Sequence, residues 1–204
     1  MEKKEKQKVD PSVSFRVEKI RHSLAHLLAS VVVEFWPKTK LAIGPTIESG
    51  FYYDMEILSD KKQATNDKKM LTTEDLQKIE ARMKELIKEN QKFVGKKVSK
   101  ITAKKLFKNS PYKLKIIKEL PGKTVGTYQN GNFLDLCRGG HVTNTKEIDP
   151  NSFKLVKIAG AYWRGDEKNK MLTRIYGVAF ETEKELQEYL KMQEEAEKRD
   201  HKII

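Results

Sequence analysis

The sequence predicts an α+β domain in which an antiparallel sheet has flanking helices and a charged connector helix follows. Two segments, 16–35 and 72–92, repeat apolar residues at the spacing of an amphipathic helix. Short apolar segments bounded by turn residues indicate strands elsewhere in the chain. Two of these segments flank Asn130-Gly131, a favoured pair for a two-residue hairpin turn, and a hairpin joins antiparallel strands.

The chain is predicted to begin with a disordered tail and a long helix. Residues 1–14 are rich in lysine, and the tail is expected to end near Pro11. The helix is predicted from Arg16 to Phe35, and Pro37 ends it. Its apolar stripe consists of Val17, Ile20, Leu24, Leu27, Leu28 and Val31.

Two strands and a loop are predicted next. The apolar run 41–47 contains Gly44-Pro45, which indicates a brief strand that enters a turn. Residues 51–55 are predicted to form the following strand, which Gly50 opens. The polar residues 59–71, rich in lysine and aspartate, are predicted to form a loop.

Three helices are predicted between residues 72 and 120. Thr72 and Asp75 have the spacing of a capping box at the start of the first helix. Its apolar stripe is Leu76, Ile79, Met83, Leu86 and Ile87. A shorter helix is predicted over 102–107 and another over 112–120.

The last third predicts strands followed by the connector helix. Thr182 and Glu185 form a second capping box, and the charged helix that it opens extends to about Arg199. We expect a tail at 1–14, one domain at 15–181 and a connector helix at 182–204. The predicted strands are 125–129, 133–136, 153–158, 161–164 and 171–180.

The composition favours a polyanionic partner and a reducing compartment. The 204 residues include 41 Lys and Arg against 29 Asp and Glu, a formal charge of +12, which suits nucleic acid. Cys137 is the single cysteine, so no disulfide can form within the chain. No apolar run approaches the roughly 20 residues of a membrane span, and residues 1–10 do not resemble a secretory signal. We therefore expect a cytoplasmic protein.

Two short motifs contain the residues best suited to chemistry. His22 and His26 lie four residues apart, which places both imidazoles on one face of a helix. Asp135 and Cys137 share a face of the predicted strand, and Gly139-Gly140 can turn the chain so that His141 returns beside Cys137. The histidine pair and the pair of Cys137 and His141 together suit a tetrahedral zinc site, a metal-free site with a histidine general base, or a nucleophilic thiol. The residues alone leave these three alternatives open.

Seven motifs together resemble the bacterial-type threonyl-tRNA synthetase family. The resemblance covers about Phe15 to His201 and concerns the editing domain, which alanyl-tRNA synthetases share more distantly. The motifs are His22-Ser-Leu-Ala-His26, Ile43-Gly-Pro-Thr-Ile-Glu-Ser-Gly-Phe-Tyr-Tyr-Asp54, Tyr112-Lys113, Asp135-Leu-Cys-Arg-Gly-Gly-His141, Ala159-Gly-Ala-Tyr-Trp-Arg-Gly-Asp166, Arg174-Ile-Tyr-Gly177 and Arg199-Asp-His201.

The resemblance implies hydrolysis of seryl-tRNA that was made by mistake for threonine. Serine lacks one methyl group of threonine, and a binding pocket rejects a missing methylene by only about 1–3 kcal/mol, so a second pocket must remove the error. Lys113 and His22 are implied to position or deprotonate the attacking water, and Asp135 to orient the substrate amine or hydroxyl. The full implied set is His22, His26, Lys113, Asp135, Cys137 and His141 as catalytic residues, with Tyr53 and Tyr128 binding substrate. For Trp163 and Arg164 we expect core packing and a surface contact.

The resemblance also bears on metal, partners and assembly. In the alanyl relatives His22, His26, Cys137 and His141 correspond to zinc ligands, whereas the threonyl group works without metal, so we favour no cofactor and keep zinc as the alternative. The family usually has proline in place of Gly140. A non-catalytic tRNA-binding remnant and a zinc-binding alanyl-type module are the competing readings. We expect a monomer that does not charge tRNA by itself, since full-length relatives dimerise through a catalytic part whose motifs this sequence does not contain.

Overall fold

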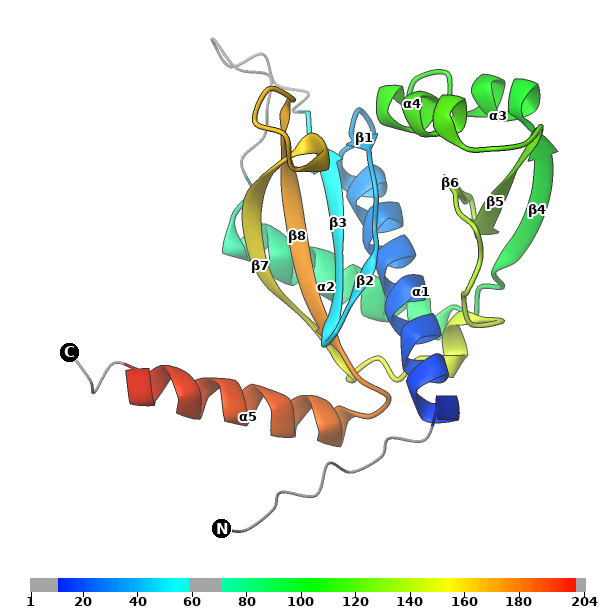
Figure 1. Cartoon of the computed structure of the whole chain (residues 1–204). Helices are drawn as coiled ribbons and strands as arrows, with labels where there is room; N and C mark the ends of the chain where they lie inside the picture. The colour runs from blue at the N-terminus through cyan, green and yellow to red at the C-terminus, as the bar shows by residue number, and fades with distance from the viewer. Residues whose placement is uncertain (1–10, 59–70, 201–204) are drawn as a thin grey trace.

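The computed structural model describes residues 11–58 and 71–200, and these residues confirm the α+β class. They contain five α-helices and two antiparallel sheets, where one sheet was expected (Figure 1). The predicted loop at 59–71 lies outside the described residues except for Leu71, and so does His201. None of the described helices is both long enough and apolar enough to cross a bilayer.

The larger sheet has five antiparallel strands. Its central order is β1-β3-β8-β7, and β2 also pairs with β3. The strands are β1 Lys40–Leu41, β2 Thr46–Ile47, β3 Gly50–Glu56, β7 Phe153–Tyr162 and β8 Met171–Ala179. The predicted strand 41–47 is therefore two short strands, which the segment around Gly44-Pro45 separates. The predicted strands 153–158 and 161–164 are largely one strand, β7, with a bulge between Leu155 and Lys157.

Two helices bury their apolar stripes against this sheet. Helix α1 is Pro11–Phe35 and helix α2 is Thr73–Lys88. The capping box of Thr72 and Asp75 is present, and all five residues of the predicted α2 stripe are buried. The main core joins these stripes to the inward face of the sheet, and its largest members include Ile20, Leu24, Met83, Phe51, Met55 and Phe153.

The smaller sheet and two short helices form a second unit, which we call the small lobe (residues 92–138). Its strands are β4 Val94–Ser99, β5 Thr124–Asn130 and β6 Phe133–Leu136, in the order β4-β5-β6. Helices α3, Lys100–Leu106, and α4, Pro111–Glu119, pack on it as predicted. Ala103, Phe107, Ile117 and Val125 make its own small core. Figure 1 shows α1 between the larger sheet and the small lobe.

Three predictions need correction. Helix α1 begins at Pro11 and not at Arg16, because proline fits a first helical turn whose N–H groups have no helical partner. The turn of the β5–β6 hairpin is Gly131-Asn132 and not Asn130-Gly131, since Asn130 pairs with Phe133. Gly131 has φ 52°, which suits the first position of a type II′ turn. Strand β4 was not predicted, because its lysines and glycine are poor strand formers and its edge position leaves it largely exposed.

The chain continues through two 3₁₀ turns, Thr145–Glu147 and Trp163–Gly165, and ends its described part in helix α5, Glu183–Asp200. The second capping box is confirmed: the Glu185 N–H donates to Thr182 Oγ1 at 3.3 Å, and the Thr182 N–H donates to Glu185 Oε2 at 3.2 Å. Residues 1–10 of the predicted tail lie outside the described residues.

Candidate functional site

A cavity of about 450 Å³ opens between α1, β3 and the small lobe. Seven of the eight predicted site residues line it, although they come from segments up to 119 positions apart. They are His22, His26, Tyr53, Lys113, Asp135, Cys137 and His141. The eighth, Tyr128, does not line the cavity, but its ring centroid is 4.7 Å from that of His141.

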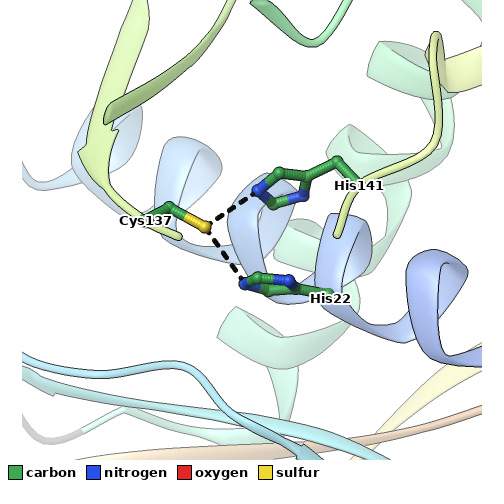
Figure 2. Close-up of side chains that lie close together, drawn as sticks. All are labelled: His22, Cys137 and His141. Carbon is green, nitrogen blue, oxygen red and sulfur yellow. Dashed lines mark hydrogen bonds between the residues drawn. The ribbon is translucent and has the colours of Figure 1, made fainter. Parts of the chain in front are cut away.

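Cys137 lies between two imidazoles. Its Sγ is 3.4 Å from Nε2 of His22 and 3.2 Å from Nε2 of His141, as Figure 2 shows. The glycine turn produces this arrangement, since Gly139 has φ 108° and Gly140 has φ 90°, a region that other residues rarely adopt. The Gly139 N–H donates to the sulfur at 3.3 Å. The structure thus agrees with the expectation that this turn returns His141 to Cys137.

A buried ionic network forms the opposite side of the site. Lys113 Nζ lies 2.6 Å from Asp135 Oδ1, and both side chains are less than 10% exposed (4% and 8%). Tyr53 Oη donates to Asp135 Oδ2 at 2.5 Å and accepts from Lys113 Nζ at 2.9 Å. Burial, followed by the negative charge of Asp135, raises the pKa of Tyr53 well above its usual value. The phenol therefore stays protonated and holds the carboxylate in place.

Comparison with known proteins decides the family. Residues 125–176 match the family described as the threonyl and alanyl tRNA synthetase second additional domain. The threonine–tRNA ligase of Borrelia turicatae is 48% identical over 187 residues, 91% of this chain. Those of Dehalococcoides mccartyi and Thermotoga neapolitana are each 50% identical, over 92% and 90% of this chain.

The chain is homologous to the editing-domain region of threonyl-tRNA synthetases. It spans 30%, 30% and 27% of the length of these three ligases. The family match contains Tyr128, Asp135, Cys137 and His141, whereas the remaining predicted site residues precede it in the chain. The cavity is therefore assembled from the matched segment and from α1, β3 and α4.

Burial keeps the imidazoles of the site neutral at about pH 7. Burial lowers the pKa of His26 to about 4. Burial, followed by the nearby His22 and His26, lowers the pKa of His141 to about 2. Burial also lowers the pKa of His22, although the backbone of Gly140 and the charge of Asp135 oppose it. The same effect raises the pKa of the Cys137 thiol. At neutral pH the site thus offers neutral imidazoles, of which His22 is the one whose protonation its neighbours favour, and a thiol that is a poor nucleophile.

Two further residues support the site but were not predicted. Ser23, fully buried, accepts the Val142 N–H at 3.0 Å, and its Oγ is 3.4 Å from Nδ1 of His141. Phe93 stacks on the His141 ring, with centroids 4.8 Å apart and an angle of 9°. The position of Ser23 directly after His22 was an available signal, whereas nothing in the sequence near Phe93 indicates this contact.

Trp163 and Arg164 take the places expected of them. Trp163 is buried, with its ring centroid 5.0 Å from that of Tyr112 in a small apolar cluster. Arg164 is exposed and forms an ion pair with Glu119 of α4. Neither residue lines the cavity that holds the histidines.

The site also contains three potential metal ligands. Among the described residues, the donor atoms of His22, Cys137 and His141 lie within 4.8 Å of one another. Two imidazoles and a thiolate with an open position are a donor set that catalytic zinc accepts. His26 is not part of this group, and both of its ring nitrogens are buried without a hydrogen-bond partner in the described structure. A zinc ion would thus fit three of the four predicted ligands.

Proposed function

We propose that this chain hydrolyses the ester that joins serine to threonine tRNA, and thereby removes mischarged serine. The observation that supports it best is the cavity that combines neutral imidazoles with the buried network of Lys113, Asp135 and Tyr53. These groups can activate a water and orient an amino acid without metal. The homology to threonyl-tRNA synthetases supplies the substrate class.

In the proposed reaction a water oxygen bonds to the ester carbonyl carbon. One of its protons passes to His22, and the bond to the ribose oxygen then breaks as protonated His22 returns that proton to the leaving oxygen. The Lys113 ammonium either positions the water or stabilises the negative charge that develops on the carbonyl oxygen. Cys137 and His141 complete the wall of the cavity next to His22.

We propose that Asp135 binds and orients the amine or hydroxyl of the substrate. A carboxylate has about four acceptor positions. Three are taken by Lys113, Tyr53 and the Leu136 N–H, the last at 2.8 Å from Oδ1. The free position is on Oδ2, and it gives the seryl group a fixed anchor. Tyr53 and Tyr128 are proposed to contact the seryl group or the terminal adenosine.

A zinc-dependent hydrolase is the second candidate, because the three donor atoms of His22, Cys137 and His141 lie close together. Bound there, zinc would supply a water of lowered pKa. We favour the metal-free reaction, since only three of the four predicted ligands lie together among the described residues. His26, the fourth predicted ligand, stays outside the group.

The direct test is ester hydrolysis by the purified chain. Seryl-tRNA and threonyl-tRNA, both on threonine tRNA, are incubated with the chain in the presence and absence of a zinc chelator. Loss of serine alone, unaffected by the chelator, is the expected result. Inhibition by the chelator would favour the zinc-dependent reaction. Intact esters together with retained tRNA binding would identify a non-catalytic binding module and contradict the proposal.

Variants then assign the reaction to the site. His22→Ala is expected to slow serine hydrolysis by about 10²–10⁴-fold, the usual contribution of a general base. Lys113→Met should have an effect of similar size, since it removes the ammonium group that pairs with Asp135 and Tyr53 in the cavity. Lys157→Met, at an exposed position of β7, is the matched control and should leave the rate unchanged. Circular dichroism verifies that each variant is folded.

A further inference from the structure

The positive charge of the chain is concentrated in the small lobe. Residues 92–138 contain eleven lysines and Arg138 but only two acids, Glu119 and Asp135. This segment therefore carries ten of the twelve net positive charges in less than a quarter of the sequence. The rest of the chain is close to neutral.

Nine of the eleven lysines of the small lobe are exposed and lack acidic partners among the described residues. None of the nine exposed ones forms an ion pair with another described residue, and the two acids of the lobe are already paired, with Lys113 and Arg164. In the larger unit, by contrast, Lys78, Lys84 and Lys170 each pair with a glutamate. The nine are Lys92, Lys96, Lys97, Lys104, Lys105, Lys108, Lys115, Lys118 and Lys123.

Helix α4 joins this surface to the cavity. Its residues Lys113 and Ile116 line the cavity, whereas Lys115 and Lys118 are exposed on the same helix. Helix α3, which contacts α4 (Figure 1), contributes Lys104 and Lys105, and Lys108 follows just after this helix. These three lysines line a shallow depression. Exposed, unpaired lysines thus extend from the helix that lines the cavity over the outside of the lobe.

We propose that the small lobe is the docking surface for the tRNA acceptor stem, whose phosphates contact these lysines while the 3′ end enters the cavity. This inference rests on the proposed function for its choice of partner. Lysine ammonium groups are point charges that bind phosphates without reading bases. The phosphates of a polyanion can pair with many of these lysines at once. A surface of this kind positions the stem and leaves recognition of the amino acid to the cavity.

The test uses two triple variants of the full chain with the same change of charge. One variant, called the α3 triple, replaces Lys104 and Lys105 of α3 and the neighbouring Lys108 by alanine. The control triple replaces the exposed Lys154, Lys157 and Lys168 of the larger unit. The Kd for uncharged threonine tRNA is measured from about 50 to 200 mM salt, the range in which phosphate contacts weaken strongly. The α3 triple is expected to raise Kd about tenfold or more and to reduce the salt slope by about one per lysine. The control triple should change both by far less.

A substrate without a stem separates this inference from the proposed function. The α3 triple should hydrolyse the seryl ester of the trinucleotide CCA as fast as the unchanged chain does. Equal effects of the two triples on tRNA binding, or a matching loss with the CCA ester, would overturn the docking surface even if hydrolysis itself is observed. Conversely, selective weakening of tRNA binding in a chain that cleaves no ester would retain the docking surface and reject the proposed function.

Discussion

At the scale of single residues, the site is defined by imidazoles that burial keeps neutral. His26 is the clearest case, because it is 3% exposed and neither ring nitrogen has a hydrogen-bond partner among the described residues. Its ring instead packs near Phe133, Phe93 and His141, at centroid distances of 4.8, 5.7 and 5.0 Å. A protonated imidazole at this position would be a desolvated charge, so the folded chain disfavours it.

This burial predicts a loss of stability in acid. The pKa of His26 is about 4 in the folded chain against 6.5 in the unfolded chain, so the unfolded chain binds more protons between these values. The free energy of unfolding should therefore fall as the pH drops from 6.5 towards 4, by about 3 kcal/mol for this residue. Denaturant unfolding measured at about pH 7.5 and at about pH 4.5 gives the change in the free energy of unfolding.

His26→Leu should remove that part of the pH dependence. The neighbouring substitution Phe93→Leu is the control, because it removes an aromatic contact of His26 but keeps the titrating group. An unchanged difference between the two pH values in His26→Leu would show that His26 is not the group responsible.

At the scale of elements, the turn from Cys137 to His141 decides whether the site forms. Both glycines have positive φ, and a Cβ on Gly139 would lie 2.8 Å from Tyr128 Oη, too close to be accommodated. A Cβ on Gly140 would meet only His22 Nδ1, at 3.5 Å. Proline cannot adopt φ 90°, so relatives with proline in place of Gly140 require a different backbone conformation at this residue.

Gly140→Ala is predicted to weaken both the turn and the reaction. The positive φ should cost about 1–2 kcal/mol of stability, and a displaced His141 should slow serine hydrolysis tenfold or more, since about 1 Å of misplacement can cost 10²-fold. Gly122→Ala is the matched control, with φ 78° and nothing within 4 Å of the added Cβ. It should lose similar stability in thermal unfolding but hydrolyse at the normal rate. Equal rates in the two variants would refute a specific role of the turn.

At the scale of the whole molecule, the cavity exists because two separately packed units meet along α1. The larger sheet supplies Tyr53, the small lobe supplies Lys113 and Asp135, and α1 supplies the histidine pair. Helix α5 takes no part in this arrangement. Among its residues Leu186 is buried in the structure, and Tyr189 contacts Phe180 with ring centroids 5.0 Å apart.

A chain shortened to residues 1–182 is therefore predicted to keep its site. It should lose about 2–3 kcal/mol of stability, the usual value for one buried leucine, and retain its hydrolysis rate and tRNA affinity. Leu186→Ala in the full chain should reproduce most of that loss. A shortened chain that folds but hydrolyses slowly would contradict our proposal that residues 182–204 serve as a connector.

Local patterns were enough to predict most helices and two motifs of the candidate site. The stripes of α1 and α2, both capping boxes and the β5–β6 hairpin depend on residues a few positions apart, so they are legible in sequence. Lys113, Tyr53 and Tyr128 came only from resemblance to a family, since a lone lysine or tyrosine has no local signature. The exact hairpin loop shifted by one residue, because strand pairing and not the turn pair alone sets the register.

Long-range contacts account for what sequence could not supply. Strand β4 pairs with a strand that begins 25 residues after its own end, and the division into two sheets depends on such pairings. The lysines of the small lobe are visible in sequence, but their lack of acidic partners follows from the positions of Glu119 and Asp135 in space. Likewise, the network of Tyr53, Lys113 and Asp135 joins three elements. Residue type and local spacing therefore specify the elements and the candidate chemistry, whereas burial, charge pairing and protonation arise only when distant segments exclude water together.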